Sequence, residues 1–153
     1  MWFKNLQILR LAQGWEYSSE LLSAALGKGV FQPCGATDRI ARGWVPPRGN
    51  EHELVFTVAR QQLVALGIEQ KLLPAAVVRQ YADTKMAAVE TAQGYKPGRK
   101  QAREIRDQVE LELLPRAFVK RSLTYAWIDP QHRWLVVDAS ASTRADEVIE
   151  QFK

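Results

Sequence analysis

The sequence predicts an α+β protein, with an antiparallel sheet body, flanking helices and a projecting antiparallel helical hairpin. Hydrophobic residues make up 46% of the 153 residues and charged residues 25%, which is typical of a globular chain with a core. Apolar residues alternate in several short segments, as they do in strands. In two longer segments near the middle they recur every three or four positions, as they do on one face of a helix.

The first elements are a strand, a short helix and a loop. Residues 2–11 are dense in apolar side chains and predict a strand. Ser18 is a suitable N-cap for a helix over 19–26, which two nearby glycines end. Residues 31–49 contain many prolines and glycines, so we expect a loop there.

A β-hairpin is predicted next. Two segments alternate apolar and polar residues, with apolar positions at Leu54, Phe56 and Val58 and then at Val64, Leu66 and Ile68. The turn between them, near Arg60 and Gln61, lacks glycine, so the sequence leaves its type open.

Two helices with narrow apolar stripes follow. The first begins at Pro74, where proline suits the first turn, and carries Val78, Ala82, Met86 and Val89. Residues 94–98 break it. The second runs over 99–114 with Ala102, Ile105, Val109 and Leu113. A narrow stripe supports a helix–helix seam rather than a thick core. We therefore expect residues 74–114 to form an arm, and residues 1–73 and 115–153 to form the body.

The chain then returns to the body. Pro115 ends the second helix, and residues 118–128 predict a strand whose one face carries Val119, Leu123, Tyr125 and Trp127. Residues 129–132 are turn-forming, and 134–139 predict another strand. Ser142 can cap a last helix that carries Val148, Ile149 and Phe152.

No membrane segment or enzyme motif is expected. No apolar run approaches the roughly 18 residues of a transmembrane helix, and the first residues lack the features of a signal peptide. The one cysteine, Cys34, fits a reducing compartment, so we expect a cytoplasmic protein. His52 and His132 are too isolated for a zinc site, so we expect no metal, no cofactor and no catalysis. Asp129 and Asp138 leave a metal-dependent nuclease as an alternative.

The net charge of +4 resides in one segment. The segment from Tyr95 to Arg121 contains eight basic and four acidic residues. The rest of the chain therefore carries no net charge. Three of the cations have an acid four residues later, which predicts the helical pairs Lys100–Glu104, Arg103–Asp107 and Arg106–Glu110.

Five other cations have no such partner and are the candidates for binding the phosphates of DNA. They are Lys96 and Arg99 at the tip of the arm, and Arg116, Lys120 and Arg121 at its base. Tyr95 is an aromatic neighbour that could contact a base or sugar. Phe118 lies among the basal cations, and we expect it at a subunit interface.

Several short motifs resemble one bacterial family, the recombination-associated protein RdgC. The motifs are MWFKNL at 1–6, FQPCG at 31–35, GWVPP at 43–47, KLLP at 71–74, LLPRAF at 113–118 and WID at 127–129. Their joint order and spacing span the whole chain. Family members are about twice this length, so we expect this chain to match the N-terminal half, with the C-terminal half absent. The family's Asn-Gly near 60–61 is missing here.

The resemblance implies a protein that binds DNA without sequence preference, as a ring-shaped homodimer around double-stranded DNA, with single-stranded DNA as an alternative ligand. It implies a nucleoid-associated role in recombination and replication-fork repair that includes restraint of the RecA recombinase. Residues 74–114 would be the family's tip element, and Phe118 would lie near the gate where subunits meet. Two alternatives stay open: a dimerisation fragment whose DNA contact lies mostly in the missing half, and a metal-dependent exonuclease.

Overall fold

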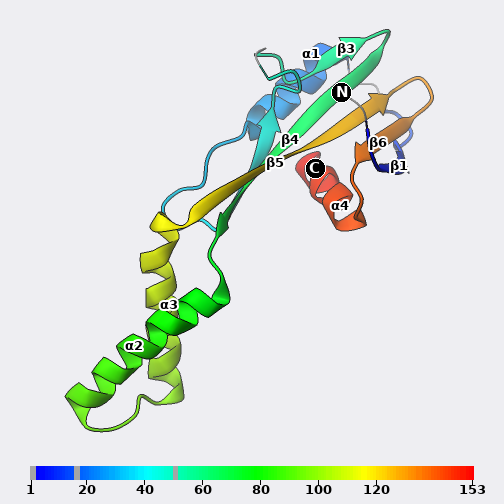
Figure 1. The fold of residues 1–153 in the computed structure, drawn as a ribbon. Coiled ribbons are helices and arrows are strands. Elements are labelled where there is room, and N and C mark those ends of the chain that lie inside the picture. The colour runs from blue at the N-terminus through cyan, green and yellow to red at the C-terminus, as the bar shows by residue number, and fades with distance from the viewer. Residues whose placement is uncertain (1–2, 16–17, 50–51) are drawn as a thin grey trace. The chain divides into compact units, whose positions relative to one another are not determined.

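The structure, a computed structural model, describes residues 3–15, 18–49 and 52–153 and has an α+β fold (Figure 1). Within these residues the elements are, in order, β1 (Leu6–Arg10), α1 (Ser19–Leu26), the 3-10 helix η1 (Gly27–Gly29), β2 (Ile40–Val45), β3 (Phe56–Val58), β4 (Gln61–Leu72), α2 (Ala75–Gln93), α3 (Arg99–Leu113), the 3-10 helix η2 (Leu114–Arg116), β5 (Phe118–Asp129), β6 (Trp134–Asp138) and α4 (Ser142–Gln151). The predicted fold class is confirmed.

The strands form one antiparallel sheet. Its order is β1-β6-β5-β4-β2, and β3 also pairs with β4. The register places Leu9 of β1 opposite Leu135 of β6, and Ile128 of β5 opposite the same Leu135. Strand β1 and the distant hairpin of β5 and β6 therefore contribute apolar side chains to one row.

One face of the sheet carries the core, and helices α1 and α4 pack against it. Leu22 and Leu26 of α1 and Val148 of α4 are buried there. They meet alternating residues of the long strands, which are Val64, Leu66, Ile68, Ala126, Ile128, Leu135 and Val137. Alternate residues of a strand share a face, so these positions belong to one surface. Phe152 packs against the same core and lies 4.6 Å from the Trp44 ring.

The N-terminal elements follow the prediction. The first strand covers Leu6–Arg10 and is shorter than the predicted strand over 2–11, since residues 3–5 and Leu11 are not part of it. Trp2, at the start of the predicted strand, lies outside the described residues. Ser18 caps α1 as expected, because its side chain accepts a hydrogen bond from Leu21 N at 3.3 Å.

The predicted loop over 31–49 is wrong for Ile40–Val45, which forms strand β2. Gly43 lies inside the strand because of a tertiary contact. A Cβ built there would lie 2.3 Å from Phe31 Cα. Phe31 N also donates to the Trp44 carbonyl at 3.0 Å. Gly43 thus permits two backbones to pass in direct contact, a use of glycine that sequence alone does not distinguish from a turn.

The predicted hairpin of β3 and β4 is confirmed, with antiparallel pairing of Phe56 with Leu63. Its two turn residues are Ala59 (φ 47°) and Arg60 (φ 69°), one position earlier than expected. Positive φ at both central positions is the geometry of the tight turns that suit a twisted hairpin, which normally use asparagine or glycine.

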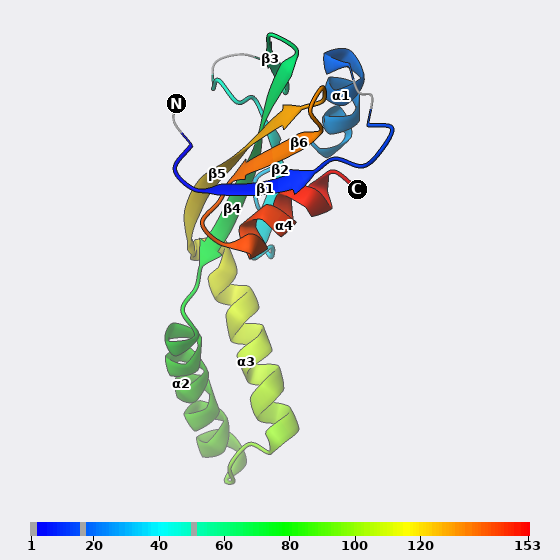
Figure 2. The same ribbon diagram turned by 90° about the vertical axis from the view of Figure 1, so that its right-hand side faces the viewer.

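The chain divides into two compact units. Unit 1 comprises residues 1–32, 41–68 and 121–153, and unit 2 comprises residues 33–40 and 69–120. Unit 2 contains α2 and α3, which run antiparallel beside each other (Figure 2). The predicted boundaries of body and arm stay a prediction.

The seam between α2 and α3 lies where the stripes predicted it. Ala82 of α2 and Val109 of α3 are buried, and the other stripe residues are half-buried. Lys85 Nζ lies 2.7 Å from Glu112 Oε2, which adds an ion pair between the helices. The remaining surface of α3 is free to carry charge.

The last three elements agree with the prediction in position but differ in detail. In β5 the buried face carries Thr124, Ala126 and Ile128, whereas Leu123 on the other face is 53% exposed. Helix α4 begins at Ser142, and its N-cap is Ala141 without a side-chain cap. The predicted Ser142 cap is therefore wrong by one residue, because Ala141 takes the extended conformation that an N-cap requires.

Candidate nucleic-acid interface

The turn that joins α2 to α3 is held in a fixed conformation. Gly94 adopts the left-handed conformation (φ 80°) and its N–H donates to the Glu90 carbonyl at 2.8 Å, which ends α2. Gln93 Nε2 donates to the Tyr95 carbonyl at 2.8 Å, and Gln101 Nε2 donates to Gln93 Oε1 at 3.1 Å. These bonds connect both helices through the turn, so side chains on it are presented from a defined backbone.

The N-terminus of α3 lies directly after this turn and is electropositive. Gly98 is the N-cap, no side chain caps the helix, and no acid lies in its first turn. The free N–H groups and the helix dipole favour an anion at this end. Lys96 and Arg99 are both exposed here. Within the described part of the chain, neither has an ion pair or a side-chain hydrogen bond. Cations beside a positive helix end oppose folding unless an anion binds, so this arrangement suits phosphate.

The middle of α3 is neutralised as predicted at two of three positions. Lys100 Nζ lies 4.0 Å from Glu104 Oε1, and Arg103 Nε lies 3.9 Å from Asp107 Oδ2. Both are long pairs between exposed side chains, which contribute little to stability.

The third predicted pair, Arg106–Glu110, is wrong. Glu110 Oε1 instead accepts a hydrogen bond from Arg39 Nε at 2.7 Å. Arg39 precedes β2 by one residue and is far from α3 in sequence, so helical spacing could not reveal it. Arg106 is exposed and, among the residues that the structure describes, has no ion pair. It is therefore a further free cation that the sequence analysis missed.

The basal candidates are exposed but differ in environment. Arg116 ends η2, and Lys120 lies in the first part of β5. Neither forms an ion pair in the described ranges. Arg121 belongs to unit 1 and already takes part in an interaction within the chain, so it is the weaker candidate. The tip cations precede or begin α3 and the basal cations follow it, and the assignment of all five to DNA stays a prediction.

Two aromatic side chains of unit 2 are strongly exposed. Phe118 is 84% exposed and Tyr95 is 67% exposed. A phenylalanine with this exposure has no packing role in the isolated chain, which fits a surface covered by a partner. Tyr95 directly precedes Lys96 in the turn before α3.

The two aspartates of the nuclease alternative are occupied by structural hydrogen bonds. Asp129 accepts from His132 N at 3.1 Å and contacts His132 Nδ1 at 2.8 Å, and the His132 bond lowers the pKa of this carboxyl. Asp138 accepts from the N–H groups of Lys4 and Asn5 at 3.0 Å each. In the described part of the chain, no three His, Cys, Asp or Glu residues are grouped so that they could hold a metal ion.

Cys34 lies in a structural cluster rather than beside a base. Its N–H donates to Glu69 Oε1 at 2.8 Å, and its Sγ donates to the Glu69 carbonyl at 3.5 Å. Burial, with Glu69 nearby, raises the pKa of the thiol, which disfavours a reactive thiolate. Lys71 Nζ donates to the carbonyls of Gly35 and Ala36, so the cluster fastens residues 33–40 to β4.

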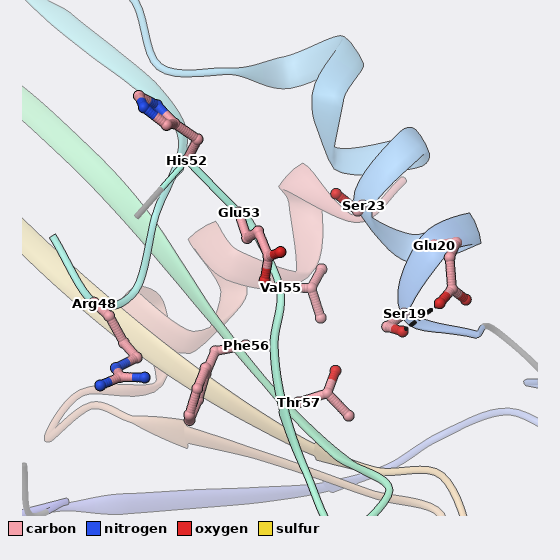
Figure 3. A pocket seen from close by; sticks show the side chains of 9 residues that line it. All are labelled: Ser19, Glu20, Ser23, Arg48, His52, Glu53, Val55, Phe56 and Thr57. Carbon is pink, nitrogen blue, oxygen red and sulfur yellow. Dashed lines mark hydrogen bonds between the residues drawn. The ribbon is translucent and has the colours of Figure 1, made fainter. Parts of the chain in front are cut away.

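A cavity of about 780 Å³ in unit 1 lies between α1 and a facing side formed by Arg48 and residues 52–57 (Figure 3). The α1 side chains Ser19 and Ser23 line it, with His52 and Glu53 on the facing segment. Ser19 Oγ donates to Glu20 Oε1 at 3.2 Å, and His52 points away from both serines. The serines and the histidine therefore do not form a nucleophile–base pair, which requires hydrogen-bond distance.

Among the described helices, none is both long and apolar enough to cross a membrane. The geometry thus defines an α+β chain with unpaired cations and an uncapped helix N-terminus at the tip of a helical hairpin, features of an anion-binding surface.

Comparisons with known proteins identify the family of the chain. A family described as "Putative exonuclease, RdgC" matches residues 1–153. The chain is 50% identical to the recombination-associated protein RdgC of Janthinobacterium sp. (strain Marseille), with 98% of this chain and 50% of the relative covered. It is 49% identical to that of Herminiimonas arsenicoxydans, with the same coverage, and 42% identical to that of Dechloromonas aromatica, with 100% of this chain and 50% of the relative covered. The chain belongs to the RdgC family, and it spans about half the length of these relatives.

Proposed function

We propose that this chain binds DNA without sequence preference and acts in recombination and replication-fork repair. The observation that carries the proposal is the tip of unit 2, where Lys96 and Arg99 lie unpaired beside the uncapped N-terminus of α3. Contacts of this kind bind phosphate without reading bases, so they confer affinity rather than sequence preference. The recombination-associated names of the relatives supply the biological context.

The acidic residues between Tyr95 and Arg121 pair with cations other than Lys96 and Arg99. Glu104 and Asp107 pair with their own helix, whereas Glu110 and Glu112 pair with Arg39 and Lys85 outside the segment. The tip cations Lys96 and Arg99 are therefore not neutralised by these acids and can bind a ligand. Duplex DNA presents a dense row of phosphates, so several such cations can be used together.

We propose that the chain binds DNA without cleaving it. Asp129 and Asp138 are the acids that suggested metal-dependent chemistry, and each accepts hydrogen bonds from the backbone around it. Incubation of labelled duplex DNA with the protein and magnesium or manganese should leave the strands intact. Cleavage that disappears in Asp129→Asn or Asp138→Asn would establish a nuclease instead.

The test of DNA binding is a fluorescence-anisotropy titration of labelled duplexes at increasing salt. The logarithm of the association constant should fall linearly with the logarithm of salt, by about 0.9 per phosphate contact. Two duplexes of unrelated sequence should give equal affinities. Binding that is insensitive to salt would refute the phosphate mechanism.

The tip assignment has a matched control on the same helix. Lys96→Gln with Arg99→Gln removes two unpaired charges, whereas Lys100→Gln with Arg103→Gln removes two charges that already have acidic partners. We expect the first variant to lose affinity several-fold and to reduce the salt slope by about two contacts. Equal losses in both variants would mean that net charge, rather than the tip, drives binding.

A second candidate function is assembly, and the exposure of Phe118 favours it. In this alternative Phe118 mediates homodimerisation. The dimer would form a ring around DNA and would restrain RecA. DNA contact would then lie mostly in the half of the family's sequence that this chain does not match. Binding and assembly are compatible in a longer protein. Nucleoid association would follow from either.

A further inference from the structure

Three parts of unit 1 meet at one end of the sheet. They are the end of β1, the turn between β3 and β4, and the turn between β5 and β6, and both turns lie at the same end of the sheet in Figures 1 and 2. Gln61 Nε2 donates to Asp129 Oδ2 at 3.5 Å, which connects the two turns. Leu11 N donates to the Arg133 carbonyl at 3.1 Å, which connects β1 to the second turn.

Each of these parts contributes an exposed arginine. They are Arg10 at the end of β1, Arg60 in the first turn and Arg133 in the second. Asp129 is the acid at this end that contacts both turns, and its side chain is 8% exposed and bonded to His132 and Gln61. Within the described ranges none of the three arginines forms an ion pair. We call Arg10, Arg60 and Arg133 the hairpin-end cluster.

Two members of the cluster have a backbone conformation that arginine rarely adopts. Arg60 has a φ of 69° and Arg133 a φ of 57°. Glycine or asparagine takes this region at lower cost, and glycine is the usual residue in such hairpin turns. Among the residues that the structure describes, neither arginine side chain has a hydrogen bond, an ion pair or a ring contact that would stabilise its turn. Strained backbone that persists without a structural benefit is a feature of functional sites.

The third member is held in place by its neighbours. The Arg10 guanidinium carbon lies 4.0 Å from the centroid of the Trp134 ring, and Arg10 Nη1 donates to the His132 carbonyl at 3.2 Å. A cation on an aromatic face keeps its charge while losing rotational freedom. Arg10 is therefore fixed before any ligand arrives, which lowers the entropic cost of binding.

We propose that the hairpin-end cluster is a second surface for the phosphate backbone of nucleic acid, separate from the tip of unit 2. The inference rests on the proposed function in taking DNA as the ligand. Guanidinium groups bind phosphate through paired N–H donors, and they are distributed here over neighbouring exposed turns. Cations that are spread over a strand end and two turns suit an extended polyanion better than a single small anion.

The experiment uses a substitution that separates folding from binding. Arg60→Gly with Arg133→Gly removes two charges and also relieves the strained backbone. We expect its thermal midpoint to equal or exceed that of the wild type, while its affinity for labelled duplex DNA falls several-fold and its salt slope decreases by up to two contacts, about 0.9 each. A purely structural role for the arginines predicts no loss of affinity.

Two further variants serve as controls. Lys4→Gln with Lys28→Gln removes the same charge from exposed positions of unit 1, and it should retain nearly all of the affinity. Arg60→Lys with Arg133→Lys keeps the charge and should retain most of the binding. If the lysine variant loses as much affinity for DNA as the glycine variant does, the argument from charge fails.

The outcomes distinguish this inference from the function on which it rests. If the glycine variant binds as the wild type does, while Lys96→Gln with Arg99→Gln loses affinity, the second surface is refuted and DNA binding stands. If the wild type shows no salt-dependent binding of DNA, both are refuted. If the Lys4 and Lys28 control loses as much affinity as the glycine variant, the cluster has no special role.

Discussion

Gly43 is a residue whose missing side chain determines the packing of unit 1. A Cβ there would lie 2.3 Å from Phe31 Cα and 2.5 Å from Phe31 N, and backbone atoms cannot move aside cheaply. We predict that Gly43→Ala destabilises the fold by about 2–4 kcal/mol, measured by urea unfolding. Gly27→Ala is the matched control, because nothing lies within 4 Å of its added Cβ. It should change stability by less than about 0.5 kcal/mol. Similar effects of the two substitutions would contradict the close approach.

Asp129 makes stability depend on pH in the acid range. Its hydrogen bond from His132 lowers the carboxyl pKa below the ordinary value of 3.8. The folded state therefore favours the charged form, and this contribution is complete above the ordinary value and is lost as pH falls through the lowered one. We predict that Asp129→Asn costs about 1–2 kcal/mol at pH 7. The difference from the wild type should shrink as the pH drops below 3.8.

Urea unfolding at pH 7 and at several acid pH values measures this difference. Asp83→Asn removes an exposed carboxylate from α2 and controls for the loss of one negative charge. A difference between wild type and Asp129→Asn that stays constant across the acid range would show that the ionised carboxylate is not the stabilising form.

At the scale of elements, α3 is fastened to residues 33–40 by Glu110. Its partner Arg39 lies at 2.7 Å, and the Glu110 side chain is 31% exposed. We predict that Glu110→Gln destabilises the protein by up to about 1 kcal/mol, and less at high salt. Glu104→Gln breaks the 4.0 Å pair with the 93% exposed Lys100 and should have almost no effect. Equal effects in thermal or urea unfolding would mean that the Arg39 contact adds nothing to a surface pair.

The sequence predicted those helices that are specified by residue spacing and capping within a short segment. The stripes of α2 and α3 identified the buried Ala82 and Val109, and Ser18 identified the start of α1. Strand β2 could not be predicted, because Gly43 serves a contact with Phe31 that only the folded chain brings together. The lack of glycine near Arg60 was visible in sequence. The sequence could not show that the turn residues have positive φ, which only the structure reveals.

The candidate interface shows the same division. The unpaired cations at the tip, Lys96 and Arg99, follow from counting helical neighbours. Arg106 was missed because its expected partner, Glu110, binds Arg39 from a distant segment. The hairpin-end cluster was missed because its members are scattered over a part of the chain whose total charge is zero. Charge totals by segment therefore conceal surfaces that the sheet assembles from separate turns.

At the scale of the whole molecule, a substitution at Phe118 should change self-association and leave folding almost unchanged. A side chain that is 84% exposed contributes little to the stability of the isolated chain, whereas at a subunit interface an aromatic anchor contributes strongly. We predict that the wild type self-associates and that Phe118→Ala shifts it toward monomer in light scattering over a range of concentrations. The free energy of unfolding of the monomer should change by less than about 0.5 kcal/mol.

Leu111→Ala is the matched control, because it also removes an exposed apolar side chain from unit 2. It should leave the association unchanged if the interface is specific to Phe118. A wild type that stays monomeric at every concentration would refute assembly through Phe118 in this chain. A loss of association in both variants would indicate a general apolar effect.

Because Lys120 lies two residues after Phe118 on β5, a dimer built on Phe118 would bring two copies of this cation toward the same interface. DNA should then strengthen self-association at low salt and lose that effect at high salt.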